Sequence, residues 1–309
     1  MVHFNGNAGV SQYEKRKAHF DTLLLPKARA DTFLVAGAGG IRLKGRFLAT
    51  NTERPAGLVI LNHGITADRW GMARYAKIYH EAGYHVVLYD LRNHGFSGGG
   101  FTSFGYYEKH DLVHLAAHWH ERFPKLPIGL HGVSMGAATV LQALPLMQGH
   151  LPVRFAVADC PFSSLYEQLS HHLDAYHVPN LLLLEGISLL TYLRHGFWLS
   201  DVSPIEAVKH TQVPTLFIHG KADAYVPFAM GQRLFEAQGG NKAFFPVQGG
   251  LHAGAIEKAP WRYRKAVHDF CYAIDAQDTT QHKHRLAILP PATKQHSQEK
   301  QLHSAKLGW

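Results

Sequence analysis

The segment LHGVSMGAATVL, from Leu130 to Leu141, contains one serine between two glycines, directly after an apolar run and directly before helix-forming residues. Ser134, Gly132 and Gly136 fit the pattern G-x-S-x-G, which is typical of a nucleophile elbow when it joins a strand to a helix. Glycines are needed there because neighbouring backbone approaches closely, and we expect Ser134 to adopt a strained conformation that projects its hydroxyl above the sheet. The segment therefore predicts a nucleophilic serine on a strand–turn–helix unit.

The regions on both sides of this segment alternate between short apolar runs and helical patterns. The apolar runs that indicate buried strands lie within 57–64, 84–92, 126–134, 154–162, 213–223 and 241–248. The helical patterns lie within 69–83, 106–123, 135–147, 228–239 and, near the end, 256–276. Two further apolar runs, on either side of Gly37–Gly40, indicate an antiparallel hairpin. This alternation predicts an α/β fold in which helices cover both faces of a mostly parallel sheet.

One domain accounts for most of the chain. We expect residues 31–278 to form it, with residues 1–30 as an N-terminal extension. Between about 165 and 203 the sequence is leucine-rich and aromatic, and it is longer than a crossover requires, which predicts a helical cap inserted after a strand. Residues 279–309 are polar and rich in Gln, His and Lys, so we expect a disordered basic tail.

The formal net charge of +8 is concentrated at the two ends of the chain. The first 30 residues carry +3 and the last 31 residues carry +4, which leaves +1 for the residues between them. The folded domain is therefore nearly neutral, and we expect neither a basic binding face nor a nucleic-acid partner.

The cysteine content and the hydropathy pattern bear on the compartment. Cys160 and Cys271 lie far apart and form no spacing typical of metal or redox sites. They favour a reducing compartment, with a single long-range disulfide as the alternative. No apolar run reaches the roughly 18 residues of a membrane span, and the N-terminus lacks the pattern of a signal peptide. We expect a cytoplasmic protein without a transmembrane segment, and the sequence leaves the oligomeric state open.

A serine hydroxyl is a poor nucleophile unless a base accepts its proton and an acid orients that base. Around a nucleophile elbow the chain order is serine, acid and then histidine. Asp223 stands in the loop after the apolar run 213–223, and His252 stands in a glycine-rich loop before the last helix. We expect Ser134, Asp223 and His252 to form a catalytic triad. The alternative for Asp223 is a helix N-cap or turn carboxylate.

An acyl-transfer site also needs two N–H donors for the oxyanion of the tetrahedral intermediate. We expect one from the backbone of Met135, the residue after the nucleophile. The other is expected from Ile65 in the segment LNHGIT, in which His63 and Gly64 shape the turn. Because backbone groups donate, neither side chain has to be polar.

These motifs resemble those of the α/β-hydrolase superfamily. LNHGIT, YDLRNHGFSGG, GVSMGA, HGKADAYVP and GGLHAG follow in that superfamily's order, from about Leu58 to Ile274. The chain is similar to serine-aminopeptidase (S33-like) hydrolases, and TSFGYYEKHDL and VADCPFSSLYEQLSHHL resemble segments of a subgroup of mostly uncharacterised bacterial hydrolases. The resemblance implies an α/β-hydrolase fold, a Ser134–Asp223–His252 triad and no cofactor. Members of the subgroup usually begin with a membrane-anchoring helix, which we do not expect here.

Leucines and aromatic residues of the cap are candidates for an acyl-binding pocket, although the same side chains would also serve to bury the cap on the sheet. The candidate pocket residues are His63, Leu184, Tyr192 and Trp198.

We expect no metal-binding or catalytic role for two other groups of residues. The histidines at positions 110, 114 and 118 share one helix face but lack the glutamate of a zinc motif, so we expect no metal. Cys160 follows a strand without an evident basic activator and is expected to be a packed structural thiol.

These expectations combine into a single-domain serine hydrolase that cleaves small or medium carboxylic esters, its small-molecule substrates, through an acyl-enzyme. A serine aminopeptidase or another amide or thioester hydrolase is the alternative, and a non-catalytic hydrolase-like binding protein is the alternative from another class. An aminopeptidase needs an acidic group beside the pocket to hold the substrate's ammonium. The cap offers only scattered acidic residues, namely Glu167, Asp174, Glu185 and Asp201.

Overall fold

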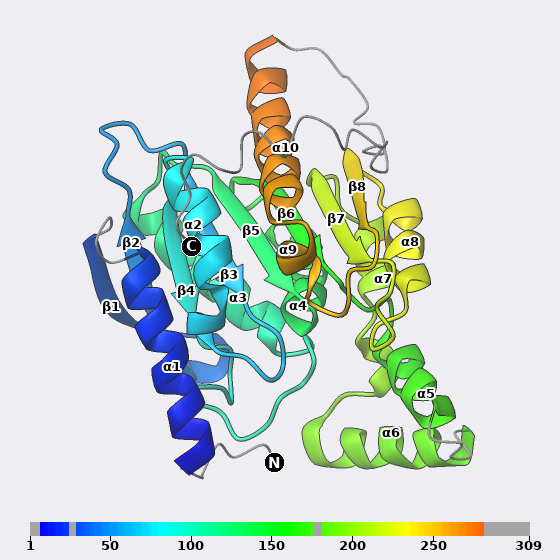
Figure 1. Ribbon diagram of the computed structural model, residues 1–309. Coiled ribbons are helices and arrows are strands. Elements are labelled where there is room, and N and C mark those ends of the chain that lie inside the picture. The colour runs from blue at the N-terminus through cyan, green and yellow to red at the C-terminus, as the bar shows by residue number, and fades with distance from the viewer. Residues whose placement is uncertain (1–6, 25–28, 176–180, 281–309) are drawn as a thin grey trace.

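An eight-stranded sheet in the order β1-β2-β4-β3-β5-β6-β7-β8 carries the fold (Figure 1). The computed structural model describes residues 7–24, 29–175 and 181–280. The strands are β1 (Arg29–Ala36), β2 (Arg42–Ala49), β3 (Leu58–Asn62), β4 (His85–Tyr89), β5 (Ile128–Val133), β6 (Val153–Asp159), β7 (Thr215–Gly220) and β8 (Lys242–Val247). β2 pairs antiparallel with both β1 and β4, whereas all pairs from β4 to β8 are parallel. The predicted parallel sheet and N-terminal hairpin are confirmed.

The central strands are continuous apolar runs because both of their faces are covered. Every residue of β3, β4, β5 and β7 is buried, and strands buried on both sides do not need polar residues at alternate positions. The hairpin reverses at Gly39 and Gly40, whose φ angles of 68° and 75° are left-handed. Glycine adopts this conformation without the steric cost of a side chain.

Helices were expected after most strands and are found there. They are α1 (Asn7–Leu24), α2 (Ala73–Glu81), α3 (Glu108–Arg122), α4 (Met135–Met147), α5 (Leu165–Ala175), α6 (Leu181–His195), α7 (Pro204–Lys209), α8 (Phe228–Ala237), α9 (Ala255–Lys258) and α10 (Pro260–Thr280), with 3-10 turns η1 (Ala38–Gly40), η2 (Arg69–Met72) and η3 (Leu199–Asp201). The sequence pattern predicted neither α1 nor α7.

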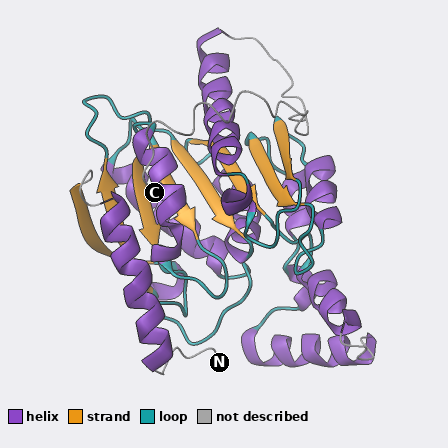
Figure 2. Ribbon diagram, viewed as in Figure 1, coloured by secondary structure: helices purple, strands orange, loops and turns teal. Residues whose placement is uncertain are grey.

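The helices form two layers, one on each face of the sheet (Figures 1 and 2). α1, α2, α9 and α10 cover one face, where Phe20, Leu61 and Tyr263 belong to a common apolar core. α3, α4, α7 and α8 cover the other face, where Leu130 and Leu141 belong to a second core. The sheet therefore separates two apolar cores.

The segment expected to form a cap leaves the carboxyl end of β6 and contains α5, α6 and η3. In Figure 1, α6 lies beyond the carboxyl ends of the central parallel strands. A smaller apolar cluster anchors this segment, with its Leu184 and Phe197 packed in the same cluster as Val226 and Met230 of the main domain. In the described part of the chain, no helix has the length and apolar character to span a bilayer.

The structure describes the N-terminal extension in part and does not describe the C-terminal tail. The N-terminal extension contains the helix α1, which packs along α2 and η2. The tail expected to be disordered lies, beyond Thr280, outside the described residues.

Candidate active site

Ser134 lies between β5 and α4, in the sharp turn that its glycines predict. Its φ is 55° and its ψ is −120°, a conformation that is strained for a residue with a side chain. A Cβ on Gly132 would lie 2.3 Å from the carbonyl oxygen of Gly136. A Cβ on Gly136 would lie 2.2 Å from the carbonyl oxygen of Asn62. The turn therefore requires glycine at both positions.

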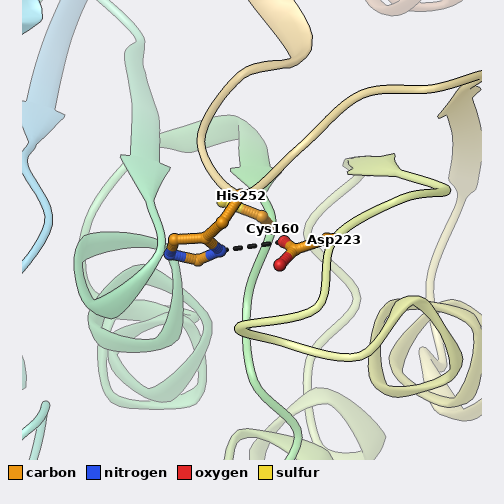
Figure 3. Close-up of side chains that lie close together, drawn as sticks. All are labelled: Cys160, Asp223 and His252. Carbon is orange, nitrogen blue, oxygen red and sulfur yellow. Dashed lines mark hydrogen bonds and ion pairs between the residues drawn. The ribbon is translucent and has the colours of Figure 1, made fainter.

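His252 lies between Ser134 and Asp223, which come from distant loops. Its Nε2 is 2.9 Å from the hydroxyl oxygen of Ser134, and its Nδ1 is 2.8 Å from Oδ2 of Asp223 (Figure 3). A carboxylate can only accept, so Nδ1 carries the hydrogen and Nε2 is free to accept the serine proton. The structure thus brings together the three residues that the sequence selected.

Asp223 is oriented by groups at both of its oxygens. Oδ1 accepts hydrogen bonds from the backbone of Tyr225 and Val226, at 3.0 and 2.9 Å. Oδ2 faces His252 and also lies 3.4 Å from Nε2 of His219. Burial acts to raise the pKa of Asp223, but hydrogen bonds from His219 and His252 outweigh it and lower the pKa to about 2. Asp223 is therefore an anion at neutral pH, and it can stabilise an imidazolium at His252.

The loop that follows β3 runs beside the nucleophile, since a Cβ on Gly64 would lie 3.5 Å from Cβ of Ser134. Nδ1 of His63 is 2.7 Å from the carbonyl oxygen of Gly64, while its Nε2 accepts from the backbone of Leu91. In a trans peptide the N–H points opposite to the preceding C=O. The hydrogen bond to Gly64 therefore directs the N–H of Ile65 away from His63. Burial lowers the pKa of His63 to about 3, which keeps the ring neutral.

Two further features of the same region fit an oxyanion site. Nε2 of His94 is 2.6 Å from the carbonyl oxygen of Ile65, which fixes the next peptide of the loop. α4 begins at Met135, so the N–H of this residue belongs to the first turn and has no acceptor within the helix. Sequence reasoning gave His94 and His219 no role here, because their contacts arise only where separate loops meet.

A cavity of about 630 Å³ opens beside Ser134 and His252. Much of its wall comes from the segment after β3, including Ile65 and Trp70. Lys15 and other residues of α1 form another part of the wall, and the sequence pattern did not indicate them. The cavity is large enough for a ligand of small-molecule size.

The four residues named as pocket candidates lie elsewhere and are not among those that line this cavity. His63 is buried beneath the loop. Leu184 is buried in the cap cluster, because it belongs to the one face of α6 that packs inward. Tyr192 and Trp198 stack on each other at 4.5 Å and are partly exposed. This cavity gives no support to a pocket role for them.

Cys160 lies close to the Asp223–His252 pair, and the three ligand atoms of these residues lie within 4.8 Å of one another (Figure 3). A thiolate is the form of cysteine that binds metals and attacks carbonyls. Burial raises the pKa of the Cys160 thiol well above its usual value, and Asp223 already holds Nδ1 of His252. This arrangement disfavours both a metal centre and a second nucleophile.

A buried polar network lies beneath the elbow. The Ser134 N–H donates to the carbonyl of Asp159 at 2.8 Å, and the Asp159 carboxyl accepts from the Tyr263 hydroxyl at 2.9 Å. The same hydroxyl lies 3.2 Å from His131, whose other ring nitrogen lies 2.9 Å from the Tyr79 hydroxyl. Burial raises the pKa of Asp159 to about 7 and lowers that of His131 to about 3.

The parallel sheet, the elbow and the position of these loops define a class of protein, and the chain belongs to the α/β-hydrolase superfamily. Residues 53–185 match the family described as "Serine aminopeptidase, S33". The uncharacterized protein YqkD of Bacillus subtilis (strain 168) is 36% identical over 242 residues, which cover 77% of this chain and 78% of that protein.

Relatives with a stated activity are more distant. Lysophosphatidylserine lipase ABHD12 of Mus musculus is 25% identical over 206 residues, covering 62% of this chain and 48% of that protein. The chain thus spans about half the length of this relative. The esterase Pf2001 of Pyrococcus furiosus superposes with a TM-score of 0.65 at 21% identity, over 82% of this chain and 93% of that one. Family membership and the lipase relative support a hydrolase, and the likeness to the esterase structure shows the shared fold.

Proposed function

We propose that the protein is a serine hydrolase that cleaves small or medium carboxylic esters, with Ser134 as nucleophile, His252 as general base and acid, and Asp223 as the orienting acid. The proposal rests on the pair of hydrogen bonds that joins the Ser134 hydroxyl to His252 at 2.9 Å and His252 to Asp223 at 2.8 Å. This chain of contacts is what a serine needs in order to lose its proton as it attacks.

In the first half of the reaction, the Ser134 oxygen attacks the ester carbonyl while Nε2 of His252 takes the hydroxyl proton. Negative charge develops on the carbonyl oxygen, where the N–H groups of Ile65 and Met135 donate to it. His252 then gives the proton to the departing alcohol, and the acyl group stays on Ser134. In the second half, His252 activates water, which releases the acid and restores the serine.

An ester substrate is favoured over a peptide with a free amino terminus. An aminopeptidase needs an unpaired acidic group to hold the substrate's ammonium. Glu257 is the acidic residue that lines the cavity, and its carboxylate pairs with Arg74. Faster turnover of aminoacyl-nitroanilides than of p-nitrophenyl esters would reverse this preference.

The proposal is tested by labelling with a fluorophosphonate probe and by assaying p-nitrophenyl esters of increasing acyl length. We expect the purified chain to be labelled and to turn over short and medium esters, and Ser134→Ala to lose both properties. Ser200→Ala serves as the matched control, because Ser200 is exposed on η3, and should retain both. Labelling that persists in Ser134→Ala would refute the assignment. A folded chain without labelling or turnover would point to the non-catalytic binding protein.

We place this activity in the cytoplasm. Cys160 and Cys271 are buried and form no disulfide with each other, which fits a compartment that keeps thiols reduced. Immunoblotting of fractionated cells tests this placement, and recovery outside the cytoplasmic fraction would contradict it.

A further inference from the structure

The helix α1 forms one side of the cavity beside Ser134. Lys15, Arg16 and His19 of this helix line the same cavity as Ser134 and His252, although more than 100 residues separate them in the sequence. A substrate at the nucleophile would therefore have basic side chains as neighbours.

Among the described side chains of α1, Phe20 and Arg16 hold the helix in this position. Phe20 is fully buried and packs edge-on against Trp70, with their ring centroids 4.8 Å apart. Arg16 donates to Oδ2 of Asp68 at 2.8 Å, while Oδ1 of Asp68 accepts from the first backbone N–H groups of η2. Because η2 belongs to the segment that follows the oxyanion loop, the helix is fixed relative to the nucleophile.

The charges that face the cavity do not cancel. Arg16 is paired with Asp68, and Arg74 is paired with Glu257. Lys15 is exposed and lines the cavity, and it forms no ion pair with any residue in the described ranges. This ammonium is available to a ligand, in contrast to the neighbouring guanidinium groups.

We propose that Lys15 selects esters that carry an anionic group, a carboxylate or a phosphate, a few atoms from the scissile bond. The inference rests on the proposed esterase function and adds a substrate class to it. Exposed ion pairs contribute little energy, so the preference due to Lys15 is about three- to fivefold in kcat/KM. Screening by salt weakens the interaction, so the preference falls as the NaCl concentration rises.

Matched pairs of substrates test this inference. Mono-p-nitrophenyl glutarate is compared with p-nitrophenyl valerate, which has the same acyl length and no charge. 1-Butyrylglycerol 3-phosphate is compared with 1-butyrylglycerol to test a phosphate on the alcohol side. The quantity measured is the ratio of kcat/KM between the charged and neutral members of each pair, at low and high NaCl.

Three substitutions at Lys15 and one control define the expected pattern. Lys15→Ala lowers the ratio by about three- to fivefold for at least one pair, Lys15→Glu lowers it by about tenfold, and Lys15→Arg retains it. Lys17→Ala leaves the ratio unchanged, since Lys17 pairs with Asp21 at 2.7 Å and does not line the cavity. Lys17→Ala also keeps the wild-type rate on the neutral esters.

The outcomes distinguish failure of the anion preference from failure of the esterase function on which it rests. Hydrolysis of neutral esters, with ratios that Lys15 variants do not change in either pair, overturns the anion preference and leaves the esterase intact. If no ester is hydrolysed at a rate that depends on Ser134, the proposed function itself is overturned. A ratio that changes only in the glutarate pair assigns the carboxylate, and one that changes only in the glycerol pair assigns the phosphate.

Discussion

Asp223 is held by hydrogen bonds at both oxygens, and this determines what it can do at His252. The backbone of Tyr225 and Val226 holds Oδ1, which leaves Oδ2 for the ring. The carboxylate therefore fixes both the direction of the imidazole and the nitrogen that carries its hydrogen. Since the pKa of Asp223 is about 2, the charge needed for this role is present at any pH above about 4.

Asp223→Asn tests this arrangement. An amide NH2 in place of Oδ2 cannot accept the Nδ1 hydrogen, so His252 adopts the other tautomer and can no longer accept the serine proton. We expect kcat on p-nitrophenyl esters to fall by about 10⁴, with little change in KM. Circular dichroism of the variant checks that the fold is retained. A loss smaller than tenfold would contradict the orienting role.

Asp159 leads to a prediction about stability against pH. Its pKa is about 7 in the folded protein, against an ordinary value of 3.8, so between these values the folded state holds a proton that the unfolded chain has lost. The unfolded state binds fewer protons, and the free energy of unfolding therefore falls as pH rises from about 4 to 7. The total decrease due to this group is up to roughly 4 kcal/mol.

Urea unfolding of the wild type and of Asp159→Asn at pH 5 and pH 8 measures this effect. The uncharged amide removes the titration, so we expect the variant to lose less stability than the wild type between the two pH values. Equal losses in the two proteins would show that Asp159 is already ionised in the fold at pH 5.

The sequence was sufficient to predict that Ser134, Asp223 and His252 would lie together, as their hydrogen bonds show, because each stands at a loop position that the strand and helix pattern defines. It was not sufficient to find the residues that support them. His219 and His94 act across loops whose meeting depends on the folded sheet, and no spacing in the sequence indicates that contact.

At the element scale, the elbow can form only if β5, α4 and β3 approach closely. Gly136→Ala would place its Cβ 2.2 Å from the carbonyl oxygen of Asn62, so backbone has to move. We expect a loss of about 1–3 kcal/mol of stability and a lower kcat, since the displaced segments carry the proposed oxyanion donors.

A matched control for this substitution lies in α6. A Cβ on Gly186 meets nothing within 4 Å, and alanine favours a helix over glycine by up to about 1 kcal/mol. Gly186→Ala should therefore leave the melting temperature unchanged or raise it. Equal losses in the two variants would argue against a special requirement for glycine in the elbow.

The elements that the sequence predicted and missed differ in how they are stabilised. β3 and β5 are buried throughout, so their apolar runs are visible in the sequence. Among its described side chains, α1 is held by the burial of Phe20 and by the ion pair of Arg16 with Asp68. One aromatic residue and one ion pair leave no apolar stripe in the sequence. The sequence pattern therefore did not indicate that residues of this N-terminal extension line the cavity.

In the whole molecule, the sheet is shared by two apolar cores, and the segment with α5, α6 and η3 packs on the main domain through a third, smaller cluster. β3 and β5 are neighbours in the sheet, and they supply Leu61 to one core and Leu130 to the other. Loss of packing on either face weakens the same strands, so both cores should unfold in one transition. Of the described side chains of α6, in contrast, Leu184 and Ser188 are the two buried ones.

This difference predicts that the cap is a separate unit of stability. Leu61→Ala and Leu130→Ala should each lower the free energy of the single urea transition by about 2–5 kcal/mol. Leu184→Ala should leave the midpoint of that transition unchanged and instead speed amide hydrogen exchange in α6, because local opening of the cap does not require opening of the sheet. If Leu184→Ala shifts the main transition as far as Leu130→Ala does, the cap segment and the sheet unfold together, and the cap segment is not a separate unit of stability.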